Sequence, residues 1–133
     1  ASAILGLLPS KHTVKGKIIF EGQNLLTQSP SQLVHLRGSR LSLILQDPAL
    51  ALNPLLPIGS QLIEGLCYHR KMNRKEAFEK GVQWLNRVGI GDAKERMRQY
   101  PHEMSGGMKQ RILIAIALIC QPSLLIADEP TTA

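Results

Sequence analysis

The sequence has 133 residues, of which 44% are hydrophobic and 20% are charged, and it carries a net charge of +6. This length and composition suit one globular domain, or a piece of a larger one, with a substantial core. They exclude a bilayer-spanning helix within this sequence, because no apolar run approaches the roughly 20 residues that such a helix needs. The charge allows an anionic partner, but the basic residues are dispersed and several alternate with glutamates, as on solvated helix faces.

Two cysteines, Cys67 and Cys120, are far apart in the chain and lack the spacing of metal ligands. We interpret both as buried free thiols in a reducing compartment, with a disulfide or a redox role as the alternative. The chain starts at Ala1 without Met and stops at Ala133, directly after its most functional-looking segment. We therefore expect it to be a piece of a longer protein.

The first part of the chain predicts two strands. Residues 15–20, followed by Glu21-Gly22, predict a short strand and a tight turn, and residues 31–36 predict a weak helical turn. Residues 41–45 (LSLIL) form a short continuous apolar run, which is typical of a strand buried on both faces of a parallel sheet.

The rest of the chain is mostly helical in pattern. Residues 58–68 and 74–88 predict helices, the second with Asn73 as its N-cap. A short basic helix is expected at 93–99 and a longer one at about 105–119, and the apolar residues 124–127 predict a last strand. Because a long helical connection joins two buried strands, the predicted fold class is α/β with a parallel sheet.

Two carboxylates, Asp128 and Glu129, directly follow the last predicted strand. In an open α/β sheet, ligands bind outside the carboxyl ends of the strands, where these side chains would project. Phosphoryl transfer needs a cation that neutralises phosphate charge and a group that orients the attacking water. Asp128 is therefore a candidate for holding Mg²⁺ through water, and Glu129 for polarising the nucleophile. A strand that merely ends in acidic surface residues has the same pattern.

A second motif, Ser105-Gly106-Gly107, opens the helix expected at about 105–119. The backbone N–H groups there lie at the positive end of the helix dipole, and the missing side chains allow a phosphate to approach closely. The alternative is an ordinary helix in which Ser105 caps its own first turn. Two consecutive glycines disfavour that alternative, because each destabilises a helix by about 1 kcal/mol relative to Ala.

These motifs together carry a family resemblance. MSGGMKQR at 104–111 and LLIADEP at 124–130 resemble the LSGGQ-type signature and the Walker B motif of ABC-transporter ATPases, and QDP at 46–48 resembles the Q-loop of that family. Finer features resemble the bacterial importers of oligopeptides, dipeptides and nickel: ILGLLP at 4–9, LNP at 52–54, YPHEMSGGMKQR at 100–111 and ADEPTTA at 127–133. Met108 stands where the general signature has Gln, a departure shared with that subfamily.

The resemblance implies an ATPase that uses ATP and Mg²⁺ to energise import, and it assigns residues. Gln46 would contact Mg²⁺ and the attacking water, while Asp128 and Glu129 keep the roles given above. Ser105, Gly106 and Gly107 would grip the γ-phosphate bound to the opposite ATPase subunit, and Gln110 of the same motif is also assigned to nucleotide binding.

The implied architecture is a fragment of a P-loop NTPase fold in which strands 41–45 and 124–127 are neighbours and strand 15–20 belongs to an antiparallel layer. The expected partners are transmembrane permease subunits and a second ATPase subunit, without nucleic acid, at the cytoplasmic face of the bacterial inner membrane. Three parts are expected: a partial catalytic core with the antiparallel layer at 1–47, a helical subdomain that docks the permease at 48–103, and the signature helix with the Walker B strand at 104–133.

No G-x-x-x-x-G-K-[ST] phosphate-binding loop occurs in the sequence. We therefore expect this chain by itself to be inactive and, since the strand that feeds that loop is missing, to self-associate. Two alternatives remain: a soluble ABC-type ATPase of DNA repair or translation, against which the QDP, LNP and YPHE segments argue, and a basic non-enzymatic binding module, which the charge supports.

Overall fold

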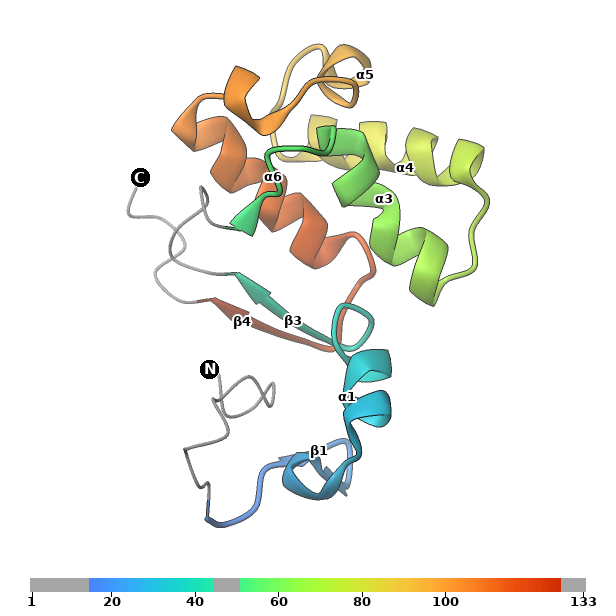
Figure 1. Ribbon diagram of the computed structural model, residues 1–133, viewed down its shortest axis with the longest axis vertical. Helices are drawn as coiled ribbons and strands as arrows, with labels where there is room; N and C mark the ends of the chain where they lie inside the picture. Colours follow the sequence, from blue (N-terminus) through green and yellow to red (C-terminus); the bar gives the residue numbers. More distant parts are fainter. Residues whose placement is uncertain (1–14, 45–50, 128–133) are drawn as a thin grey trace.

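The computed structural model describes residues 15–44 and 51–127, and Figure 1 shows their arrangement. A two-stranded parallel sheet lies at the centre. Helices gather on one side of this sheet, and a small antiparallel hairpin with a short helix lies on the other (Figure 1). The described chain is therefore a mixed α/β structure, as the sequence predicted.

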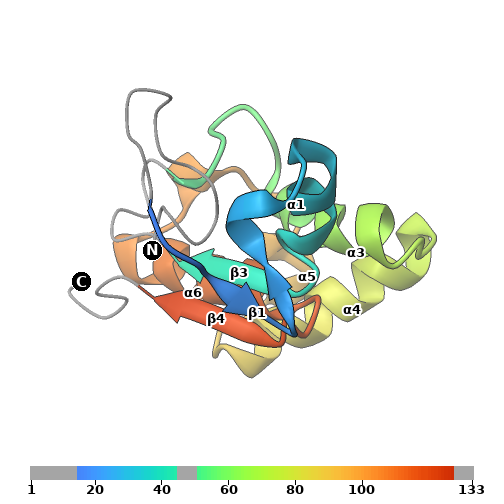
Figure 2. The ribbon, with the colours of Figure 1, turned by 90° about the horizontal axis from the view of Figure 1, so that it is seen from below.

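The central sheet pairs β3 (Leu41–Ile44) with β4 (Leu124–Ala127) in parallel, with Leu41 opposite Leu124 and Ile44 opposite Ala127. Figure 2 shows the two arrows side by side and pointing the same way. The two strands that the sequence predicted to be neighbours are thus paired, although about 80 residues of mostly helical chain separate them. Arg40 reinforces the start of the pair, because its carbonyl accepts from the Leu124 N–H at 3.0 Å and its Nε donates to Ser123 Oγ at 3.1 Å.

The hairpin on the other side of the sheet is shorter than predicted. It pairs β1 (Ile19–Phe20) with β2 (Gln23–Asn24), so only the last two residues of the expected strand 15–20 are in strand conformation. Glu21 and Gly22 form the turn with φ angles of 50° and 79°, which is the left-handed geometry that two-residue hairpin loops require. The 3-10 helix η1 (Leu25–Thr27) and helix α1 (Pro30–Leu36) follow.

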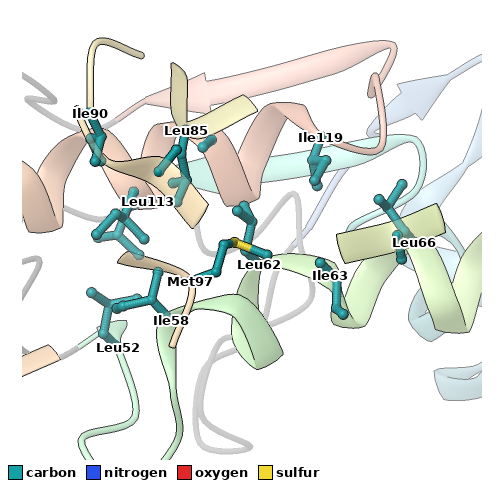
Figure 3. Close-up of a cluster of buried hydrophobic side chains, with 14 of the residues drawn as sticks. Leu52, Ile58, Leu62, Ile63, Leu66, Leu85, Ile90, Met97, Leu113 and Ile119 are labelled. Carbon is teal, nitrogen blue, oxygen red and sulfur yellow. The ribbon is translucent and has the colours of Figure 1, made fainter. Parts of the chain in front are cut away.

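The helical side of the molecule is built from α3 (Ile58–His69), α4 (Arg74–Arg87) and α6 (Gly106–Leu118), with the short α5 (Ala93–Arg96) and the 3-10 helix η2 (Pro101–Glu103) between the last two. Helix α3 packs on both α4 and α6, and α6 packs on β3. Side chains from these helices interlock in one large buried cluster (Figure 3), whose fully buried members include Ile58, Leu62, Leu66, Leu85, Met97 and Ile112.

Local sequence explains where these helices begin. The Asn73 side chain accepts from the Glu76 N–H at 3.0 Å, so the predicted N-cap of α4 is confirmed.

Helix α5 ends at Arg96, three residues before the predicted end at Gln99. The carbonyl groups of Met97 and Gln99 instead accept hydrogen bonds from the beginning of α3. This tertiary contact outweighs the helical composition of residues 97–99.

Burial differs between the two central strands. Strand β3 is buried along nearly its whole length, as its apolar sequence predicts, whereas Leu124 of the equally apolar β4 is 37% exposed and Ala127 is exposed. Among the described residues, β4 pairs only with β3, so one of its edges is not hydrogen-bonded to another strand. Composition alone therefore overestimates the burial of β4.

Both cysteines are free thiols, as predicted, but only Cys120 is buried, and Cys67 is half-buried. Within residues 15–44 and 51–127, no helix has both the length and the apolar character needed to cross a bilayer.

Candidate phosphate-binding site

The predicted phosphate site lies at the exposed beginning of α6. Ser105 has extended backbone angles (φ −66°, ψ 161°), and its Oγ accepts from the Met108 N–H at 3.3 Å, so it is the N-cap of the helix. The N–H groups of Gly106 and Gly107 have no hydrogen-bond partner in the described part of the chain. Two free donors, next to a hydroxyl that can still donate its own hydrogen, therefore face solvent at the positive end of a 13-residue helix.

The fold itself does not require glycine at these two positions. A Cβ added to Gly106 or to Gly107 would meet nothing within 4 Å, and neither residue has the positive φ that favours glycine. By contrast, a Cβ on Gly59 would lie 2.6 Å from the Met97 carbonyl oxygen. The glycines of α6 thus weaken the helix without relieving any contact with the described residues, and the open space above them can admit another group.

The other predicted nucleotide-binding residue of the motif lies elsewhere. Gln110 is 7% exposed, so its side chain is turned into the protein, away from the exposed surface of Ser105, Gly106 and Gly107. Its assignment to nucleotide binding stays a prediction.

The predicted catalytic and metal residues Gln46, Asp128 and Glu129 lie outside the described residues. The structure does place the strands that precede them in sequence side by side. Ile44 and Ala127, the last residues of β3 and β4, are paired, so the carboxyl ends of the two strands meet at one edge of the sheet. This is the edge at which ligands of open α/β sheets bind.

Sequence reasoning did not predict the hydrogen-bonded loop at residues 53–56. The Gln61 side chain, from the first turn of α3, accepts from the Asn53 N–H at 2.8 Å and donates to the carbonyls of Asn53 and Leu56, each at 2.9 Å. Three hydrogen bonds from one amide thus fix the loop, which presents Leu55 at 82% exposure and Leu56 at 43%. A lone Gln in a helical pattern looks like a solvated surface residue, so only the tertiary structure identifies it.

A groove begins beside this loop and runs between α3 and α4. One part of it has a volume of about 470 Å³, and its lining combines apolar atoms with Arg74, Lys75 and Arg98 and contains no carboxylate. These three side chains form no ion pair with any residue in the described ranges. The groove is therefore suited to a partner segment that brings apolar side chains and negative charge.

Two further groups have shifted pKa values, and both lie far from the α6 site in sequence. Burial lowers the pKa of His69, and the neighbouring His35, Arg70 and Lys71 lower it further. Burial also raises the pKa of the Cys120 thiol, so this cysteine is a poor nucleophile.

Comparison with known proteins shows the family of this chain. The family described as ABC transporter matches residues 1–132. The oligopeptide transport ATP-binding protein OppD of Escherichia coli is 47% identical over 133 residues, and the dipeptide transport ATP-binding protein DppD of Bacillus subtilis is 50% identical over 135 residues. Each alignment covers all of this chain but 40% of the relative, so the chain spans about two fifths of the length of these proteins.

Solved structures share the fold. A dimeric post-hydrolysis state of the ATP-binding cassette MJ0796, described as bound to ADP and Pi, matches with a TM-score of 0.80 at 23% identity, over 90% of this chain and 50% of that one. The fold is thus that of an ATP-binding cassette of the P-loop NTPase class. The chain belongs to the ABC transporter family, and within it resembles the ATP-binding proteins of oligopeptide and dipeptide transport.

Proposed function

We propose that this chain is part of the ATP-binding and ATP-hydrolysing subunit of an importer that takes up peptides. The observation that carries the proposal is the pair of glycines at the exposed beginning of α6, which the fold does not need and which leave two N–H donors free. A phosphate group explains both features, because it accepts hydrogen bonds and requires close backbone approach. Peptides are proposed as cargo because the relatives named above are oligopeptide and dipeptide transport proteins; a nickel complex, the other cargo of the resembling importers, has no such support.

In this proposal, Ser105, Gly106 and Gly107 bind the terminal phosphate of ATP held by a second ATPase subunit. A site shared between two subunits suits the exposed position of these residues. Asp128 and Gln46 are proposed to hold Mg²⁺, and Glu129 to orient the attacking water. Carboxylate and amide oxygens are ligands that Mg²⁺ accepts. Gln46 follows β3 and Asp128 follows β4 in the sequence, and the parallel pairing of these two strands supports the proposal.

The permease is proposed to dock at the clamped loop 53–56 and the basic groove beside it. Two exposed leucines on a fixed loop suit burial against another protein, since a rigid loop loses little conformational entropy on binding. Residues 48–103 would then form the permease-binding subdomain between the catalytic parts at 1–47 and 104–133. Docking to an inner-membrane permease would keep the protein at the cytoplasmic face of that membrane.

The experiment uses a protein of the relatives' full length that contains this sequence. The variant Glu129→Gln removes the charge that orients water but keeps the shape of the side chain. We expect it to abolish ATP hydrolysis while ATP still produces a dimer on a sizing column. The control is Glu95→Gln, an equal change at an exposed residue of α5. Wild-type turnover in Glu129→Gln would overturn the proposed role of Glu129, and loss of activity in Glu95→Gln would show that the assay lacks specificity.

A further inference from the structure

The beginning of α3 is capped by another part of the backbone. Helix α3 follows Pro57 and has no side-chain cap. Instead, the Ile58 N–H donates to the Gln99 carbonyl and the Gly59 N–H donates to the Met97 carbonyl, both at 2.8 Å. Orphan donors at the start of a helix normally find side chains or water, so this use of a distant segment fixes residues 97–99 directly onto α3.

The side chain of Met97 strengthens the same connection. It is 2% exposed and lies against Gly59 of α3 and Gly81 of α4. A Cβ on Gly59 would lie 3.1 Å from Met97 Cε, and a Cβ on Gly81 would lie 2.6 Å from it. We call this arrangement, formed by Met97 with Gly59 and Gly81, the Met97 socket. Unlike Gly106 and Gly107, the two glycines of the socket are closely packed: a Cβ on Gly59 would meet the Met97 backbone, and a Cβ on Gly81 would displace the Met97 side chain.

A stiff turn connects the socket to the candidate phosphate site. The Tyr100 N–H donates to Glu103 Oε2 at 2.7 Å, and the Met104 N–H donates to the Pro101 carbonyl at 3.1 Å within η2. Pro101 and Met104 are both buried. Since both ends of this turn are fixed in the core, a shift of residues 97–99 moves Ser105 instead of being absorbed by a slack loop.

We propose that Met97 is a positioning residue that fixes the phosphate-binding residues 105–107 to the beginning of α3. Gln61 joins the loop 53–56 to the first turn of α3 by its side-chain hydrogen bonds. The first turn of α3 in turn contacts residues 97–99 through backbone hydrogen bonds and the Met97 socket, and the turn 100–104 connects these residues to Ser105. A partner that binds Leu55 and Leu56 therefore contacts a segment that is connected to Ser105 through packed and hydrogen-bonded residues. The functional meaning rests on the proposed function, because the position of residues 105–107 matters for hydrolysis only if they bind phosphate.

The test measures amide hydrogen exchange residue by residue in this 133-residue chain, without nucleotide. Met97→Ala empties the socket. The matched control is Leu66→Ala, which truncates a buried side chain of the same core near the other end of α3. Exchange rates are compared after correction for the global stability of each variant. We expect at least tenfold faster exchange at Ile58, Gly59 and Met108 in Met97→Ala, and no selective change at these three amides in Leu66→Ala.

Two more variants keep the proposal testable if Met97→Ala fails to fold. Met97→Leu retains most of the buried volume and is expected to restore protection. Gly81→Ala fills the socket from α4 without making a cavity, and is expected to raise exchange at Ile58 and Gly59 and, through the turn, at Met108. Unchanged protection of Met108 in both Met97→Ala and Gly81→Ala would overturn the proposal. This outcome is independent of the proposed ATPase function, which Glu129→Gln tests separately.

Discussion

The sharpest prediction concerns Gly107→Ala, because stability and function should change in opposite directions. Gly107 is in the first turn of α6, has no positive φ and has nothing within 4 Å of the place where a Cβ would be. Replacing Gly by Ala inside a helix lowers the backbone entropy of the unfolded chain and stabilises the helix by about 0.5–1 kcal/mol. No collision opposes this gain, so we expect the free energy of unfolding to rise by about 0.5 kcal/mol.

The assay is urea unfolding followed by circular dichroism, with the midpoint concentration and the slope fitted for each variant. Gly89→Ala is the contrasting control in the same chain. Gly89 ends the turn after α4 with a φ of +75°, and a Cβ there would lie 3.1 Å from Arg111 Nη1, which also donates to the Gly89 carbonyl at 3.0 Å. A left-handed Ala costs roughly 1–2 kcal/mol, so this variant should be less stable than the wild type.

Function should follow the opposite order in a protein of the relatives' full length. The new methyl group of Gly107→Ala occupies the space through which a phosphate would approach the free N–H groups. We expect ATP hydrolysis to fall at least tenfold, equivalent to about 1.4 kcal/mol of lost transition-state stabilisation. A variant that is less stable than the wild type would refute the claim that the fold does not need this glycine. A more stable variant with normal hydrolysis would refute the phosphate site.

Three other predictions address the chain as it stands. Because its sequence contains no G-x-x-x-x-G-K-[ST] loop, ATP·Mg²⁺ should bind no tighter than about millimolar in calorimetry; micromolar binding near one-to-one stoichiometry would contradict this. The pKa of His69 is lower in the folded chain than its usual 6.5, so the unfolded state binds more protons. The free energy of unfolding should therefore fall as the pH drops through about 6.5 and below. His69→Gln should flatten this part of the pH profile in urea unfolding, and an unchanged profile would exclude His69 as its source. Strand β4 has an edge without a partner among the described residues and a partly exposed apolar face, so we expect a dimer or larger oligomer. A monomer in light scattering at high concentration, with no binding of a hydrophobic dye, would show that this edge is protected.

The sequence by itself determined most of the element types and the family. Continuous apolar runs identified β3 and β4 as strands of a parallel sheet, and side-chain caps fixed the beginnings of two helices, Asn73 for α4 and Ser105 for α6. These features depend on neighbours within four residues, so a sequence pattern contains them. The family followed from short motifs whose residue types are dictated by phosphate chemistry.

Only the tertiary structure decided which residues connect α3 to residues 97–99 and to the loop 53–56. The early end of α5 and the caps at the start of α3 come from one tertiary contact, in which the Gln99 and Met97 carbonyls accept from the Ile58 and Gly59 N–H groups. Met97 and Gln61 look like ordinary core and surface residues in the sequence, because their partners lie many positions away or on another segment. Two glycines show most clearly that the sequence alone does not reveal packing. Gly81 and Gly107 are both helical glycines, and the sequence singled out only Gly107. The packed structure shows that a Cβ on Gly81 would displace the Met97 side chain, whereas a Cβ on Gly107 would have open space, because the difference depends on what distant residues place there.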